Sequence, residues 1–408
     1  MQQHQKYVPL RDRSTGKLLP RFLFVSNIAA KQPGEIIHGN ERVLRARLSD
    51  AKFFYDQDRR TRLETRVPRL AAVVHHNKLG SQLDRVERIR KLAGTIARQL
   101  KTDAAAAERA AYLSKADLLT EMVGEFPELQ GSIGRYYALH DGEPQAVADA
   151  IGEHYRPRFA GDKVPESAVA CAVALADKLD TLAGLFSIGQ QPTGDRDPFG
   201  LRRAALGIVR IIVENKLPLS LNDLVDAAFE PFMSRMPVEL IEFVNERFAG
   251  YLKDLGFSTL QVEAVLSRNQ LRPSLVPQQL EAVKAFQALP EAESLASANK
   301  RVANILKQAE AKGESFANAE PGELTEPAER ALCEAIRSTS AKAGALYDRG
   351  DYAGYLTSFS VLKAPVDAFF DKVMVMADDP KVRRSRLALL HDLREAMNRV
   401  ADISKLAA

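Results

Sequence analysis

The stretch from Ser167 to Phe186 has the pattern of a long helix that is apolar nearly all round at Cys171–Ala176, and this feature limits the possible folds most strongly. No polar side chain interrupts Cys171–Ala176, and a helix that is apolar on every face belongs in the interior of a protein. We therefore expect this helix to be the central one of a larger helical assembly. The surrounding stretches, from residue 115 to residue 206, also carry apolar residues at helical spacing. Their short loops mix acidic and basic groups, which favours a functional site.

Strand-like sequence is concentrated near the start of the chain. Lys6–Leu10 and Arg21–Asn27 are extended apolar runs, separated by a turn at residues 14–16, with Pro20 before the second run. A two-stranded hairpin of this size is not stable alone. We therefore expect residues 1–39 to be the remnant of a domain that precedes them.

The rest of the chain has helical patterns, including a predicted helix that begins at Pro68 and continues through Leu79. Changes in pattern divide it into residues 40–215, residues 216–270 and residues 271–408. The polar stretch Lys312–Pro327 is rich in glycine, proline and glutamate, which predicts a surface loop. The predicted fold class is mainly α.

Composition indicates a folded protein of a reducing compartment. Hydrophobic residues make up 46% and charged residues 27%, and no apolar run approaches the ~20 residues of a membrane span. The first residues contain no apolar signal core. Cys171 and Cys333 lie far apart in helical patterns, so they form neither a disulfide framework nor a metal knuckle. These features predict a cytoplasmic protein without a membrane partner.

Positive charge is unevenly distributed along the chain. Residues 40–101 contain 16 Lys and Arg against 7 Asp and Glu, although the whole chain carries a net charge of only +4. Basic pairs recur later at Arg202–Arg203, Lys300–Arg301 and Arg383–Arg384. Such a distribution favours a phosphate-rich partner, although any single pair is common on helix surfaces.

Candidate metal ligands occur in the order seen in HD-superfamily phosphohydrolases. These helical enzymes hold divalent metals with a His, a His-Asp pair and a later Asp, and residues 72–180 resemble that scaffold. His76 and Asp177 match the first and last ligands, but the middle pair falls at Ala116–Asp117. Alanine offers no lone pair to a metal, and His140–Asp141, the alternative pair, stands at a helix end. We predict an HD-like scaffold without a functional metal site.

No catalytic arrangement is apparent. The sequence lacks a GxxxxGK[ST] phosphate loop, a GxGxxG motif after a strand and an HExxH motif, and its serines and histidines form no recognisable nucleophile motif. The acidic pair Asp177 and Asp180 is expected to form ion pairs with Lys178 or with the Arg202–Arg203 pair.

Taken together, the motifs resemble one family, the β subunit of bacterial heterotetrameric glycyl-tRNA synthetase. The resemblance begins near His4 and continues in family order to the C-terminus. It is carried by FVSNI, IIHGNERVLRARLSDAKFFYDQDR, KADLLTEMVGEFPELQGSIGRYYALHDGE, HYRPRFAGD, ALADKLDTLAGLF, PTGDRDPFGLRRAALGIVRII, ASANKRVANIL and VDAFFDKVMVMADD. Family members carry B3/B4-like domains before this region, so we expect the chain to be a C-terminal portion.

The resemblance implies a domain plan and a division of labour. Residues 1–39 would be the hairpin remnant, 40–215 an HD-like helical domain, 216–270 a helical linker and 271–408 an anticodon-binding domain of the arginyl-tRNA synthetase type. Glycine activation, with ATP and Mg²⁺, would belong to a separate α subunit in an α2β2 assembly. This chain would hold no cofactor, and it would bind tRNA(Gly) without being active alone.

The predicted function is therefore non-catalytic tRNA binding, which positions tRNA(Gly) for the α subunit. The alternatives are an HD-type metal-dependent phosphohydrolase and a module that mainly binds the α subunit. Guanidinium groups suit phosphate binding because they pair with it through two parallel hydrogen bonds. The residues predicted to bind tRNA are Arg45, Arg47, Arg59, Arg60, Arg62, Lys78, Arg202, Arg203, Lys300, Arg301, Arg383, Arg384 and Arg386.

Overall fold

The computed structural model describes residues 6–29, 31–232, 238–268, 272–314, 316 and 324–407. The chain divides into two compact units, residues 1–60 and residues 61–408. The described part is mainly helical, with two small antiparallel hairpins, which confirms the predicted fold class.

The first unit contains the predicted hairpin and one long helix. Strands β1 (Val8–Arg11) and β2 (Leu18–Leu23) pair in antiparallel fashion, with Val8 opposite Leu23 and an irregularity between Pro9 and Arg11. Pro20 lies inside β2 rather than before it. The irregularity explains this placement, because proline is tolerated at a bulge where no ladder hydrogen bond is required.

Helix α2 (Pro33–Asp58) follows the hairpin and begins earlier than the predicted start of the helical pattern at residue 40. Pro33 occupies the first helical position, where the absence of its N–H group costs nothing. The hydroxyl of Tyr7 donates a hydrogen bond of 2.7 Å to Oδ1 of Asn40, which joins the N-terminal segment to this helix.

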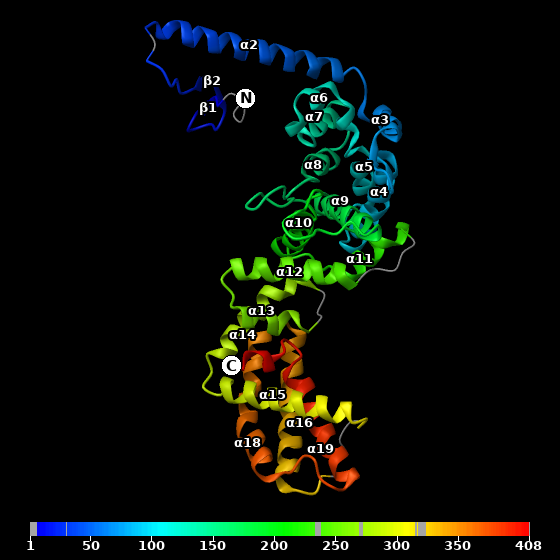
Figure 1. The fold of residues 1–408 in the computed structure, drawn as a ribbon, viewed down its shortest axis with the longest axis vertical. Helices are drawn as coiled ribbons and strands as arrows, with labels where there is room; N and C mark the ends of the chain where they lie inside the picture. The colour runs from blue at the N-terminus through cyan, green and yellow to red at the C-terminus, as the bar shows by residue number, and fades with distance from the viewer. Residues whose placement is uncertain are drawn as a thin grey trace. The chain divides into compact units, whose positions relative to one another are not determined.

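In the second unit, helices surround α9 (Ala168–Ser187), whose residues are nearly all buried (Figure 1). Its neighbours are α4 (Gln82–Gln99), α5 (Ala104–Leu113), α8 (Gln145–Glu153), α10 (Leu201–Glu214) and α11 (Leu221–Phe229). The prediction that the Ser167–Phe186 helix is central is therefore confirmed. Ser167 caps its N-terminus by accepting a hydrogen bond from the backbone of Ala170.

Short elements connect these helices. They are α3 (Leu63–Arg66), the 3₁₀ helix η1 (Val67–Ala72), η2 (Ala116–Leu119), α6 (Glu121–Glu125), η3 (Pro127–Leu129), α7 (Ser132–His140) and η4 (Glu230–Phe232).

The prediction of one helix from Pro68 through Leu79 is wrong. After η1, strand β3 (Val74–His76) pairs with β4 (Gly80–Ser81) in a tight hairpin. Gly80 has φ +88°, a left-handed conformation that glycine adopts readily and that a continuing helix would not allow. The β-branched pair Val73–Val74 also favours extended backbone. Helix α4 then begins behind a capping box formed by Ser81 and Asp84.

The C-terminal part of the second unit is a further set of packed helices. Helix α12 (Val238–Asp254) packs on α10 and on α13 (Thr259–Leu266), which contacts α14 (Val276–Gln287). The remaining elements are η5 (Pro273–Leu275), α15 (Ala292–Ala311), α16 (Pro327–Asp348), α17 (Tyr352–Ser358), η7 (Phe359–Leu362), α18 (Lys363–Lys372), α19 (Pro380–Met397) and η8 (Ile403–Leu406). The predicted boundary at residue 271 and half of the predicted loop Lys312–Pro327 lie outside the described residues.

Two further observations concern the whole described part. None of its helices is long and apolar enough to cross a membrane. Cys171 and Cys333 are both buried and unpaired, and desolvation raises the pKa of the Cys171 thiol to about 12.

Candidate functional site

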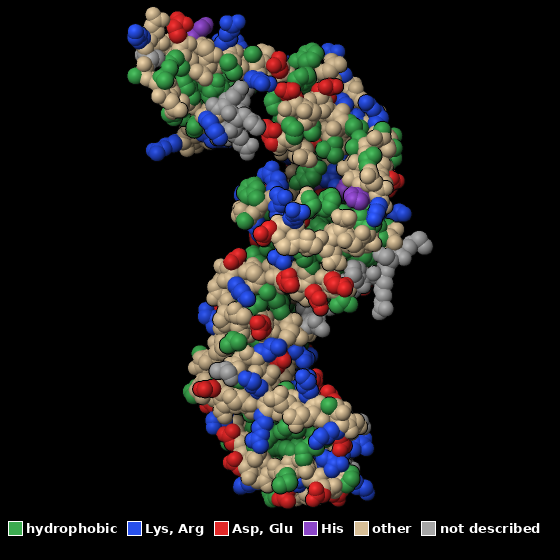
Figure 2. All heavy atoms as spheres, in the orientation of Figure 1, with side chains coloured by type: hydrophobic (Ala, Val, Ile, Leu, Met, Phe, Trp, Pro, Cys, Tyr) green, Lys and Arg blue, Asp and Glu red, His purple; other side chains and the backbone are tan. Residues whose placement is uncertain are grey.

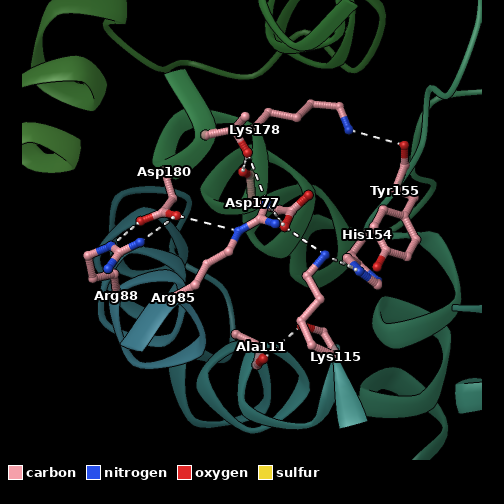
Figure 3. A network of polar contacts seen from close by, with 11 residues as sticks. Arg85, Arg88, Ala111, Lys115, His154, Tyr155, Asp177, Lys178 and Asp180 are labelled. Atoms are coloured by element: carbon pink, nitrogen blue, oxygen red, sulfur yellow. Dashed lines mark hydrogen bonds and ion pairs between the residues drawn. The ribbon is translucent and has the colours of Figure 1, made fainter. Parts of the chain in front are cut away.

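A buried charge network connects α9 to α4 and to the turn at Lys115 (Figure 3). Nζ of Lys115 lies 2.8 Å from Oδ1 of Asp177, and Nη2 of Arg85 lies 3.0 Å from the same oxygen. Nε of Arg88 lies 2.6 Å from Oδ1 of Asp180, one helical turn further along α9. The side chains of Lys115 and Asp180 are only 1% and 3% exposed, so these ion pairs are shielded from water.

His154 completes the surroundings of Lys115. Nδ1 of His154 lies 2.6 Å from the carbonyl oxygen of Ile151, to which its N–H group donates. Nε2 is then left as the acceptor for the Lys115 ammonium at 2.9 Å. The ammonium also lies 3.9 Å from the centroid of the Tyr155 ring, within cation–π range.

Burial and neighbouring charges set the protonation of the network. Desolvation lowers the pKa of Lys115 to about 8, although Asp177 opposes the shift. Desolvation would raise the pKa of Asp177, but the charges of Lys115 and Arg85 outweigh it and hold this pKa below its usual range. Desolvation and the Lys115 charge also hold the pKa of His154 well below its usual value. At neutral pH the centre is therefore an ammonium between a carboxylate and a neutral imidazole.

The acidic pair Asp177 and Asp180 forms ion pairs, as predicted, but the partners differ from the predicted ones. Asp177 and Asp180 do form ion pairs, but with Arg85, Arg88 and Lys115 rather than with Lys178 or Arg202–Arg203. The ammonium of Lys178 donates instead to the backbone carbonyl of Tyr155 at 3.2 Å. Sequence reasoning missed the partners on α4 because they lie 92 residues away along the chain.

The degenerate metal positions Asp117 and His76 are engaged in local hydrogen bonds. Oδ2 of Asp117 accepts hydrogen bonds from the backbone N–H groups of Gly131 and Gly134 at 2.6 and 3.2 Å, and Ala116 is buried. His76 lies in β3, where its Nδ1 accepts from the backbone of Lys78. Within the described ranges, no group of three or more His, Cys, Asp and Glu side chains is arranged to hold a metal ion.

The basic residues predicted in the first unit and at its boundary are surface residues. Arg45, Arg47, Arg59 and Arg60 are exposed, and the guanidinium of Arg59 stacks over the Tyr55 ring at 5.2 Å. In the second unit, Arg62 and Lys78 are also exposed. Nη2 of Arg62 donates to the carbonyl of Asp141 at 3.1 Å.

Arg202 and Arg203 lie on the first turn of α10 but differ in exposure. Arg202 is half-buried, and its guanidinium donates to the carbonyl of Gly194. Arg203 is exposed, and its guanidinium lies close to Gly200, the N-cap of the helix.

The basic residues of the C-terminal helices also fall into different environments. Arg384 is exposed, as is Arg301, which lies 4.2 Å above the Phe370 ring. Lys300 is exposed and donates to the carbonyl of Ala407 at 3.5 Å.

Arg383 and Arg386 have structural contacts. Nε of Arg383 pairs with Glu314 at 2.7 Å, and the same guanidinium caps the carbonyl of Ala377. Arg386 is buried in an ion pair with Glu329 and donates to the carbonyl of Met374. Because a buried guanidinium cannot meet a partner at the surface, we do not propose Arg386 as a contact for an external partner.

Most of the chain matches models of known protein families. Residues 1–267 match the family model described as glycyl-tRNA synthetase beta subunit, and residues 295–406 match that of the DALR anticodon binding domain. The chain is 56% identical to the glycine–tRNA ligase beta subunit of Thiobacillus denitrificans and 54% identical to that of Aromatoleum aromaticum. Each alignment covers 100% of this chain and 59% of the relative.

The chain thus spans about 59% of the length of these curated relatives. One family model covers well over half of its residues. The chain belongs to the glycyl-tRNA synthetase beta subunit family.

Proposed function

We propose that this chain binds tRNA(Gly) and positions it for aminoacylation by the α subunit of glycyl-tRNA synthetase. The observation that carries the proposal is the match of residues 295–406 to an anticodon-binding domain. Exposed arginines support it, because this region presents Arg301 and Arg384 at its surface. In this proposal ATP and Mg²⁺ act at the α subunit, within a cytoplasmic α2β2 assembly.

The contacts are proposed by region. Arg45, Arg47, Arg59, Arg60, Arg62 and Lys78 meet the acceptor arm or the elbow of the tRNA. Lys300, Arg301, Arg383 and Arg384 meet the anticodon stem. Arg202 and Arg203 face either the tRNA or a neighbouring domain. The domain limits at residues 39, 215 and 270 belong to the same proposal.

A tRNA titration at two salt concentrations tests the proposal. We expect Arg384→Ala to weaken tRNA(Gly) binding and to reduce the slope of log affinity against log salt by about one. This substitution is more informative than its pairing with Arg383→Ala, which also breaks the ion pair with Glu314. Lys253→Ala, which removes an exposed charge from α12, is the matched control. An unchanged affinity and slope for Arg384→Ala would remove this residue from the interface.

The two alternative functions require different measurements. A phosphohydrolase would show stoichiometric Mn, Zn, Fe or Ni and a nucleotide turnover that His76→Ala abolishes. The ammonium of Lys115 weighs against it, because a cation 2.8 Å from Asp177 repels a second cation at the same carboxylate. An assembly module would retain the α subunit in a pull-down without tRNA and would not bind tRNA alone.

A further inference from the structure

A cavity of about 500 Å³ lies beside the buried network, between the middle of α9 and the start of α10. It is lined by Tyr155, Arg158 and Phe159 from one loop and by Phe199 and Arg203 from another. A cavity of this size falls within the range of small-ligand sites. Over α10 and the loop before it, Figure 2 shows Lys and Arg side chains next to hydrophobic ones.

The charges around the cavity favour an anion. Arg158, Arg203 and Lys178 line it, against the acidic Glu128 and Asp177. Arg158 is in turn paired with Asp162, which does not line the cavity. The charge of Asp177 is already met by Lys115 and Arg85. Lys178 is only 6% exposed. Its ammonium has three N–H groups, and the carbonyl of Tyr155 accepts from the ammonium at 3.2 Å.

The aromatic residues favour a flat partner. Phe159 is 58% exposed and Phe199 is 44% exposed, although both are large apolar side chains. Phe199 is also held edge-on to the His76 ring, with centroids 5.9 Å apart. Exposed aromatic rings beside arginines are the usual surroundings of an unpaired nucleic-acid base, because every base presents a π face.

One of the arginines lies close to the start of α10. Gly200 has φ +68°, and a Cβ atom there would stand 3.0 Å from Nη2 of Arg203. The guanidinium therefore lies against the backbone of the N-cap, at the edge of the cavity. Nε of Arg158 lies 3.1 Å from Asp162, which orients the second guanidinium.

We propose that this cavity binds a single unpaired nucleotide, with the base stacked on Phe159 and Phe199 and the phosphate bound by Arg158 and Arg203. Lys178 contributes a further cationic group to the wall. An unpaired nucleotide of RNA and a free mononucleotide share this chemistry. The choice of RNA as the source rests on the tRNA-binding function proposed above.

Calorimetric titration of the 408-residue chain with AMP and with inorganic phosphate tests the site. We expect Phe159→Ala with Phe199→Ala to weaken AMP binding about tenfold and to leave phosphate binding unchanged. Arg158→Gln with Arg203→Gln should weaken the binding of both. Phe53→Ala and Arg69→Ala, which alter an exposed ring and an exposed arginine elsewhere, are the controls. AMP affinity that is unchanged in both double variants would overturn the proposal.

Competition with tRNA(Gly) then identifies the source of the nucleotide. Displacement of AMP by tRNA supports an RNA nucleotide in the cavity, and simultaneous binding of both supports a free mononucleotide. If tRNA binds but AMP and a single-stranded RNA trinucleotide do not, this inference fails while the proposed function stands. If AMP binds and tRNA does not, the site stands and the proposed function fails.

Discussion

Lys115 is the residue on which the buried network depends. Transfer of an ammonium group from water into the protein interior costs several kcal/mol, so it requires partners. The carboxylate of Asp177, the imidazole of His154 and the ring face of Tyr155 supply them. Its pKa of about 8 leaves it mostly protonated at neutral pH, because the attraction of Asp177 offsets part of the desolvation.

Removal of that charge should be costly. We expect Lys115→Met to lower the free energy of unfolding by about 3–5 kcal/mol, because it leaves the buried Asp177 with Arg85 as its main cation. Urea denaturation followed by far-UV circular dichroism measures the change. Lys91→Met, at an exposed position of α4, is the matched control and should cost far less. Equal effects of the two substitutions would mean that the network adds no particular stability.

Asp117 should give the protein a pH dependence of its own. Desolvation raises the pKa of this carboxyl to about 6, from 3.8. The folded state binds the proton of Asp117 more tightly than the unfolded state does. The resulting contribution to the free energy of unfolding is fully present below pH 3.8 and is lost as the pH rises through 6. It amounts to about 3 kcal/mol.

The variant Asp117→Asn isolates this effect, since an amide oxygen can still accept from Gly131 and Gly134. We expect the stability of the wild type relative to the variant to fall between pH 4 and pH 7. Stability must be compared with that of the variant because His154 changes it in the opposite direction. The pKa of His154 is lowered in the folded state, so its contribution to stability increases as the pH rises towards 6.5. A difference that stays constant with pH would contradict the prediction.

At the scale of elements, the sequence predicted the long helices well and the short elements poorly. Helix α9 was predictable because its burial follows from composition alone. The hairpin of β3 and β4 was not, since strands of three and two residues are too short to show a period. There the left-handed Gly80 decides the conformation, and a sequence pattern does not reveal the φ angle of a glycine.

Close packing of α7 on its neighbours depends on Gly134. A Cβ atom at this position would stand 2.9 Å from Oδ2 of Asp117 and 3.1 Å from Cγ2 of Ile151. We therefore expect Gly134→Ala to destabilise the protein by about 1–3 kcal/mol. Gly124→Ala in α6 is the control, because nothing lies within 4 Å of its Cβ position. Thermal denaturation compares the two, and a neutral Gly134→Ala would show that α7 can move away.

At the scale of the whole molecule, the charge of a region could be counted from the sequence, but the ion pairs that its residues form could not be predicted. The excess of positive charge in residues 40–101 includes exposed arginines such as Arg45 and Arg60. The same excess includes Arg85 and Arg88, which the fold turns inward to meet α9. Charge counting cannot separate the two groups, because the partners of the inward pair are distant in sequence.

The division into two units should be visible in proteolysis. Residues 1–60 and 61–408 form separate compact units, and the exposed Arg59, Arg60 and Arg62 stand at the boundary. We expect limited trypsin treatment to leave a resistant fragment that begins between residues 60 and 63. Mass spectrometry identifies its first residue, and a first stable cut within α9 or α10 would contradict this division.

The central cation of the network, the Lys115 ammonium, is part of a side chain and is not a bound ion. A bound metal ion can be lost to a chelator or by dilution, and a fold that needs one depends on its concentration. The cation beside Asp177 is part of the polypeptide, so it is delivered with every molecule in a ratio of one to one. The core of this helical unit therefore receives its central positive charge at translation, independently of the metal content of the cell.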